Sequence, residues 1–219
     1  MVKQFYISEK EKMDMSFLFC HDQYSILATV FASFPLPLKR HCIQTGAVSG
    51  LMAERVPESA FPEGMTRREY ADAVRYGGFY HDIAAYLAHN EYDQYPAVGY
   101  KLLSEQISEK RVPALIRQVI LETVRYSQTR YDSGGLVPLH AGICAIANQL
   151  DMALTPSSRF KRNKSVNDGA NMIGENAETF PPQAMKCFEG AWDDIAALYR
   201  QWKERPPMWK FNDLKPVFN

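Results

Sequence analysis

Apolar residues recur at helical spacing along most of the chain, in long blocks that proline and glycine interrupt. Alternation of apolar and polar residues over five or more positions, which is typical of half-buried strands, is scarce. The pattern therefore predicts an all-α fold. The expected helices span residues 10–33, 38–56, 66–89, 94–109, 112–128, 138–154 and 182–204.

Capping residues and prolines support several of these boundaries. Thr66 followed by Glu69 predicts a capping box at the start of the third helix, and Pro113 is tolerated in the first turn of the fifth. Two polar stretches, residues 129–137 and 156–167, are predicted as loops, and the second is basic. We expect an N-terminal helical segment over residues 1–37 that packs on one helical domain over 38–205, followed by a tail over 206–219.

Composition narrows the class of protein. The chain has 219 residues, of which 46% are hydrophobic, which is enough apolar material for one sizeable core. The 25 Lys and Arg residues balance the 25 Asp and Glu residues, whereas proteins that bind nucleic-acid polymers usually carry a basic excess. No apolar run approaches the roughly 18 residues of a membrane helix, and the cysteines show no Cys-x-x-Cys spacing. These features favour a cytoplasmic protein without a membrane or nucleic-acid partner.

The most informative segment is the His81-Asp82 pair, which the pattern places inside an apolar helix. Burying an ionised carboxylate without a partner costs several kcal/mol. A metal ion is one such partner, because an imidazole nitrogen and a carboxylate oxygen can bind the same cation. An internally satisfied hydrogen bond between His and Asp, without metal, is the alternative. The small residues around the pair (Gly77, Gly78, Ala84 and Ala85) would let neighbouring helices come close enough to add ligands.

Other blocks surround this pair in a recognisable order. A helix opened by His41 precedes it, Tyr95-Pro96-Ala97-Val98-Gly99 follows it, and the block 147–155 comes much later. In that order the blocks resemble the HD superfamily of metal-dependent phosphohydrolases. The nearest branch looks like the HD-GYP proteins, known for hydrolysing cyclic di-GMP. The resemblance covers residues 38–190, and it implies a single-domain helical bundle of the HD type with a metal site between helices.

The resemblance also implies roles for individual residues. His41, His81 and Asp82 match metal ligands of the family, and Asp82 is further expected as the catalytic carboxylate. Asn148 stands where the later Asp ligand belongs, and its amide oxygen would donate without charge. Asp151 matches a second Asp that supports the site. The implied cofactor is a divalent metal ion, with Mn, Fe, Mg and Zn all open.

Departures from the HD-GYP pattern suggest a reduced site. Ala85 replaces a lysine that is thought to assist catalysis, Tyr95 replaces a histidine, and Arg125-Tyr126-Ser127 replaces a His-His-Glu run. The Gly-Tyr-Pro run that names the branch is absent. We therefore expect one metal position and not a binuclear centre.

Four further residues are candidates for substrate binding. Tyr95 and Tyr126 would stack on a nucleobase, unless they only fill the core or a pocket. Arg159 and Lys161 lie in the basic loop, which would steer a phosphate towards the site, unless it is a solvated run of charges.

The leading functional hypothesis is a metal-dependent phosphohydrolase acting on a phosphoester or a nucleotide-like substrate, with a single-metal site. The alternative is a catalytically degenerate HD-GYP-like domain that binds a nucleotide or a protein partner in signalling without turnover. A plain helical interaction protein is a third hypothesis. The expected ligand is a small phosphorylated molecule or a nucleotide, and a homodimer is left open.

Overall fold

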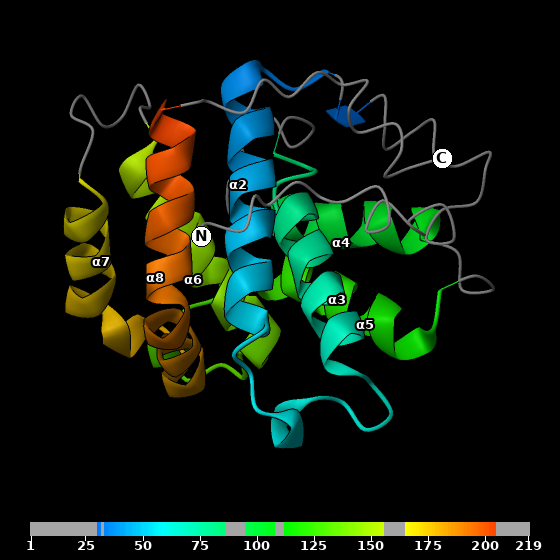
Figure 1. Ribbon diagram of the computed structural model, residues 1–219. Coiled ribbons are helices and arrows are strands. Elements are labelled where there is room, and N and C mark those ends of the chain that lie inside the picture. The colour runs from blue at the N-terminus through cyan, green and yellow to red at the C-terminus, as the bar shows by residue number, and fades with distance from the viewer. Residues whose placement is uncertain (1–29, 32, 86–94, 108–111, 156–164, 205–219) are drawn as a thin grey trace.

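A computed structural model describes residues 30–31, 33–85, 95–107, 112–155 and 165–204. It shows a single-domain helical bundle, with no strand among the described residues, which confirms the predicted all-α class. The helices, labelled as in Figure 1, are α2 (Leu36–Ala53), α3 (Arg67–Tyr80), α4 (Tyr95–Gln106), α5 (Ala114–Tyr126), α6 (Leu139–Leu154), α7 (Val166–Glu175) and α8 (Pro182–Glu204). Short 3₁₀ turns follow α2, α5 and α7.

Helix α2 occupies the middle of the bundle and packs against α3, α6 and α8 (Figure 1). Helix α5 packs against α3, α4 and α6, and α7 against α6 and α8. Fully buried side chains such as Met52, Val74, Ile120, Ile146 and Leu150 fill the space between these helices. Burial of this apolar surface stabilises the bundle and fixes how α2 lies relative to its neighbours.

Most predicted boundaries lie within a few residues of the observed ones. The capping box of α3 is present, since Thr66 accepts from the Glu69 amide and the Glu69 carboxylate accepts from the Thr66 amide. Helix α2 begins at Leu36, directly after Pro35, and α8 has the predicted range 182–204. Of the predicted helix 10–33, only residues 30, 31 and 33 lie in the described part, and they are helical. The tail 206–219 lies outside it.

The predicted helix 66–89 is wrong at its end, because α3 stops at Tyr80 and residues 81–85 form a turn. The His81 ring donates through Nδ1 to the Gly78 carbonyl at 2.8 Å. In a continuing helix that carbonyl would accept the Asp82 amide, so the side chain competes with the next helical hydrogen bond. The His-Asp pair therefore lies just after a helix and not inside one.

The predicted loop 156–167 also needs correction, because α7 begins at Val166. Ser165 caps it by accepting from the Asp168 amide, and the Asp168 carboxylate accepts from the Ser165 amide. This capping box is visible in the sequence as Ser-x-x-Asp and signals a helix start. Residues 156–164 lie outside the described part.

Glycines allow α2 and α3 to cross at close range. A Cβ atom built on Gly78 would lie 2.7 Å from the Ser49 Oγ and 3.1 Å from the Gly46 Cα. A Cβ atom on Gly46 would lie 2.8 Å from the Arg75 carbonyl oxygen. Backbone atoms cannot move aside as a flexible side chain can, so only glycine fits at this crossing.

Replacing Gly78 with alanine is expected to destabilise the protein, by about 1–3 kcal/mol, because the added methyl group forces α2 and α3 apart. The matched control is Gly174→Ala in α7, where an added Cβ meets nothing within 4 Å. That change is expected to stabilise by about 0.5–1 kcal/mol through helix propensity. Urea unfolding of both variants measures the difference, and shifts of equal sign would contradict the close crossing.

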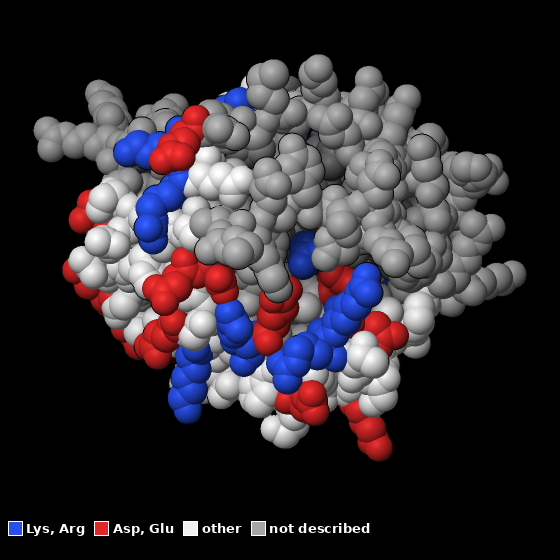
Figure 2. Space-filling model, viewed as in Figure 1, with Lys and Arg blue, Asp and Glu red and all other residues white. Residues whose placement is uncertain are grey.

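Charged side chains of both signs are interspersed over the described part of the face shown in Figure 2. Among the described helices, none has the length and apolarity needed to cross a bilayer. Cys42, Cys144 and Cys187 are buried free thiols.

Candidate metal centre

Three predicted ligands meet at one point, although His41 precedes the His81-Asp82 pair by 40 residues in the chain. His41 lies in the first turns of α2, and His81 and Asp82 lie in the turn after α3. The two Nε2 atoms are 3.2 Å apart. The Asp82 Oδ2 atom lies 3.6 Å from the Nε2 of His41 and 3.4 Å from the Nε2 of His81. The three donor atoms thus form a nearly equilateral triangle.

The other ring nitrogens determine which atoms carry lone pairs. The Nδ1 atom of His41 faces the Asp151 carboxylate at 2.7 Å, and the Nδ1 atom of His81 faces the Gly78 carbonyl at 2.8 Å. Both partners are acceptors, so both Nδ1 atoms must carry the proton. In the neutral rings each Nε2 then has a lone pair, and both lone pairs are directed into the space that Asp82 also faces.

The triangle has the dimensions of a metal-binding site. Two donor atoms that are each about 2.1 Å from one ion lie roughly 3.0–3.4 Å apart, in octahedral and tetrahedral geometry respectively. The observed separations of 3.2, 3.4 and 3.6 Å fall in or just beyond that range. His41, His81 and Asp82 could therefore hold a metal ion.

Two further buried oxygens lie unused around this group. The Asp82 Oδ1 and the Asn148 Oδ1 have no hydrogen-bond partner among the described residues. Burial of an unpartnered polar atom costs roughly 1–3 kcal/mol. A cation would bind such oxygens. The lack of a hydrogen-bond partner for the Asn148 Oδ1 therefore supports Asn148, on α6, as an additional metal donor.

Asp151 holds His41 in place from behind. Its carboxylate is fully buried and accepts from the His41 Nδ1 at 2.7 Å, from the Tyr199 hydroxyl at 2.8 Å and from the Thr155 hydroxyl at 3.2 Å. A carboxylate that accepts from the second nitrogen of a ligating histidine fixes the ring and increases its basicity. This is a supporting role, with partners that the sequence did not predict.

Tyr199 is the residue of this network that the sequence did not single out. It lies in α8, 48 positions after Asp151, and its side chain is buried. Burial raises the pKa of its hydroxyl, and the Asp151 charge raises it further. No spacing rule connects a tyrosine in one helix to an aspartate in another, so only the packing of α6 against α8 reveals the contact.

The two histidines differ in their affinity for protons. Burial lowers the pKa of His81 more than the neighbouring Asp82 raises it, so its pKa lies below the usual value. Burial also lowers the pKa of His41, but Asp151, Asp82 and Asn148 together raise it above the usual value. Without a cation, a proton on the Nε2 of His41 could instead bridge to His81, and that bridge is the metal-free alternative for the site.

The four predicted substrate-binding residues do not come together at one place. Tyr95 begins α4 and is buried. Its pKa is raised first by burial and then by the charge of Asp82, one of the three residues that could hold a metal ion. Tyr126 ends α5 and lines a separate pocket between α4 and α5. Arg159 and Lys161 lie outside the described residues, so their role stays a prediction.

Comparison of the chain with known protein families, with curated proteins and with solved structures finds no match.

Proposed function

We propose that the chain is a metal-dependent phosphohydrolase of the HD type, with a single divalent cation bound by the Nε2 atoms of His41 and His81, the Asp82 carboxylate and the Asn148 amide oxygen. The observation that carries the proposal is the pair of Nε2 atoms 3.2 Å apart, each with its Nδ1 proton already committed to an acceptor. Two lone pairs at this distance repel each other unless a cation or a proton lies between them.

When bound, the divalent cation would polarise a phosphoryl oxygen and lower the pKa of water. The residues of the chain would orient the ligands of the cation and partly balance its charge. Asp151 and Gly78 orient the imidazole rings, and Asp82 offers the one carboxylate among the proposed ligands. Because the charge of a divalent cation exceeds that of this single carboxylate, an anionic phosphoester is attracted to the site.

Tyr95 limits what the site can do. Its buried hydroxyl, with a pKa raised first by burial and then by Asp82, stays protonated near neutral pH. A protonated hydroxyl donates and does not remove a proton, and the Asp82 carboxylate is the acceptor beside it, so Tyr95 suits hydrogen bonding to an anion rather than action as a general base.

One observation favours a second candidate, a domain that binds a nucleotide or a partner without turnover. Asn148 contributes no charge where the resembled family has a carboxylate. A cation with one carboxylate ligand is expected to bind more weakly and to activate water less than a cation with two.

Metal analysis of protein purified without chelator, combined with phosphomonoester and phosphodiester assays in added Mn²⁺, Mg²⁺ or Fe²⁺, tests both candidates. A stoichiometric divalent metal together with turnover supports the hydrolase. Bound metal without turnover, with turnover created by Asn148→Asp, supports the degenerate domain. Absence of both metal and turnover contradicts the metal centre itself.

A further inference from the structure

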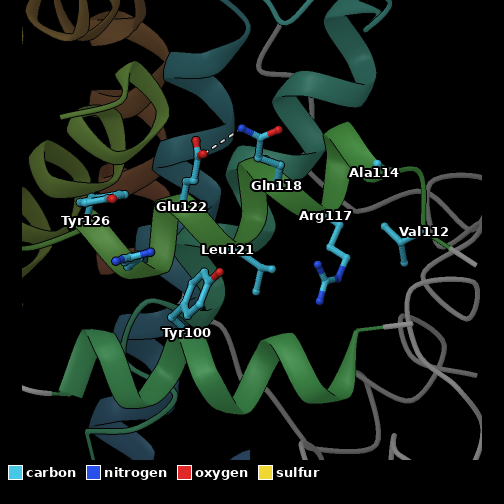
Figure 3. Close-up of a pocket in the computed structure, with 9 residues that line it drawn as sticks. Tyr100, Val112, Ala114, Arg117, Gln118, Leu121, Glu122 and Tyr126 are labelled. Atoms are coloured by element: carbon cyan, nitrogen blue, oxygen red, sulfur yellow. Dashed lines mark hydrogen bonds between the residues drawn. The ribbon is translucent and has the colours of Figure 1, made fainter. Parts of the chain in front are cut away.

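A hollow apart from the candidate metal centre lies between α4 and α5. It has a volume of about 530 Å³, within the range of about 300–1,000 Å³ typical of small-molecule sites. Figure 3 shows Tyr100 reaching up from α4 while Arg117 and Leu121 of α5 extend towards α4, so these side chains share one space. None of the residues that line the hollow belongs to the metal centre.

The hollow and the metal centre lie on different faces of α4. Gly99 is packed closely on α5 and on the turn after α3, because an added Cβ would lie 3.2 Å from Val124, 3.3 Å from Ile83 and 3.7 Å from Ala84. Tyr95 precedes Gly99 by four residues and so shares that face. Tyr100 is rotated from Gly99 by about 100° and lines the hollow, which neither Gly99 nor Tyr95 does. The two sites are therefore separate.

Two arginines make the hollow cationic. Arg117 donates through Nη2 to the Ser104 carbonyl at 2.9 Å and through Nε to the Ile107 carbonyl at 3.4 Å, which fixes its guanidinium at the end of α4. The guanidinium carbon of Arg125 lies over the Tyr100 ring, 5.1 Å from its centroid.

Arg125 keeps its hydrogen-bonding edge available. The guanidinium carbon of Arg125 also lies 5.4 Å from the centroid of the Tyr126 ring. Stacking contacts of this kind use the flat face of a guanidinium and leave its N–H groups, which point outward in the plane, unoccupied. The charge of Arg125 contributes to lowering the pKa of Glu122, but no described carboxylate lies within ion-pair distance of its guanidinium. The N–H donors of Arg125 can therefore face a ligand.

The acidic residue at the hollow is already engaged. The Glu122 carboxylate accepts from the Gln118 amide at 2.8 Å and lies 3.1 Å from the Nε2 of His140. The hydrogen bond with His140 lowers the pKa of Glu122 below its usual value. In Figure 3 Glu122 and Gln118 extend to the side of α5 away from α4, whereas Arg117 extends towards α4. Arg125 lies over the Tyr100 ring, so both arginines are on the side of the hollow that faces α4.

We propose that this hollow binds a phosphate monoester that carries a planar ring, a nucleotide-like ligand. A phosphate monoester has a charge near −2 at neutral pH, which matches the two guanidinium groups. Arg125 provides charge-assisted hydrogen bonds to the phosphate, Arg117 adds positive potential, and the partly buried Tyr100 and Tyr126 offer aromatic surface to the ring. The inference goes beyond the proposed function, because it assigns a second ligand site that needs no metal.

Calorimetric titration of the full chain with AMP, after treatment with EDTA, tests the site. AMP is expected to bind, and Arg125→Met is expected to weaken it by roughly ten- to hundred-fold, as for loss of a charged hydrogen bond. The matched control is Arg68→Met, which removes an exposed arginine of α3 and is expected to leave AMP affinity unchanged. Adenosine and inorganic phosphate probe the ring and the anion separately, and each is expected to bind more weakly than AMP.

Absence of AMP binding would overturn the inference, as would equal affinity in Arg125→Met or equal binding of either fragment. His81→Ala is expected to retain AMP binding, and its loss there would move the ligand to the metal centre and also overturn the assignment. A chain that retains no metal but binds AMP through Arg125 would contradict the proposed function and support this second site.

Discussion

Replacing His81 with alanine is expected to lower the affinity for a divalent cation by at least about a hundred-fold, since even loss of a residue that only supports a ligand typically costs ten- to hundred-fold. The reason is the triangle of donor atoms, in which the Nε2 of His81 lies 3.2 Å from His41 and 3.4 Å from Asp82. Elemental analysis after dialysis measures retained metal. Thermal unfolding with added Mn²⁺ or Zn²⁺ provides a second readout, because a ligand at a hundred times its Kd stabilises the folded state by about 2.7 kcal/mol.

His140→Ala is the matched control, because His140 is also a buried histidine but lies against Glu122 and not in the metal centre. It is expected to lose some stability and to keep the metal-induced rise in melting temperature. If His81→Ala shows the same metal-induced rise as the unmodified chain, the metal centre is contradicted. If neither protein responds to metal, the protonated His41–His81 bridge describes the site instead.

Replacing Asp151 with asparagine is expected to lower the free energy of unfolding by about 3 kcal/mol, because the fully buried carboxylate loses its charge while three donors still face it. Metal affinity is expected to fall by about ten- to hundred-fold as well, since His41 is no longer oriented by an anion. Urea unfolding and metal titration of the same variant measure the two effects.

Tyr199→Phe tests whether the effect belongs to the carboxylate. It removes one donor but leaves the 2.7 Å contact between Asp151 and His41, so a loss of about 1 kcal/mol is expected. Asp194→Asn is the surface control, because Asp194 pairs with Arg55 where both side chains are about half exposed, and its effect is expected to stay within about 0.5 kcal/mol. Equal losses in Asp151→Asn and Asp194→Asn would refute the role of Asp151.

The helices were predictable because their signals are local. The Thr66–Glu69 capping box and the prolines around α5 and α8 act within one helical turn, so sequence spacing locates them. The end of α3 was not predictable, because it depends on the hydrogen bond that the His81 ring donates to the Gly78 carbonyl. Helix α7 was missed although its Ser165–Asp168 box is equally local.

The cluster that could hold a metal ion was partly predictable for a different reason. A carboxylate and a histidine beside glycines and alanines need a partner if the segment is buried, and that need can be read from His81 and Asp82 alone. The identity of the partners depends on which helices cross. His41 comes from α2, and Asp151, 110 positions later, from α6.

By itself the sequence determined that the chain forms helices, where most of them begin, and that a few polar residues fall in segments too apolar to leave them unpaired. Only the tertiary structure decided that His41, His81 and Asp82 meet, that Tyr199 completes the support of Asp151, and that Arg125 lies over Tyr100 beside the hollow between α4 and α5. The physical reason is that helix formation depends on residues within a few positions of one another. The distance between side chains on different helices depends on how closely the backbones pack, and here Gly46 and Gly78 set that distance between α2 and α3.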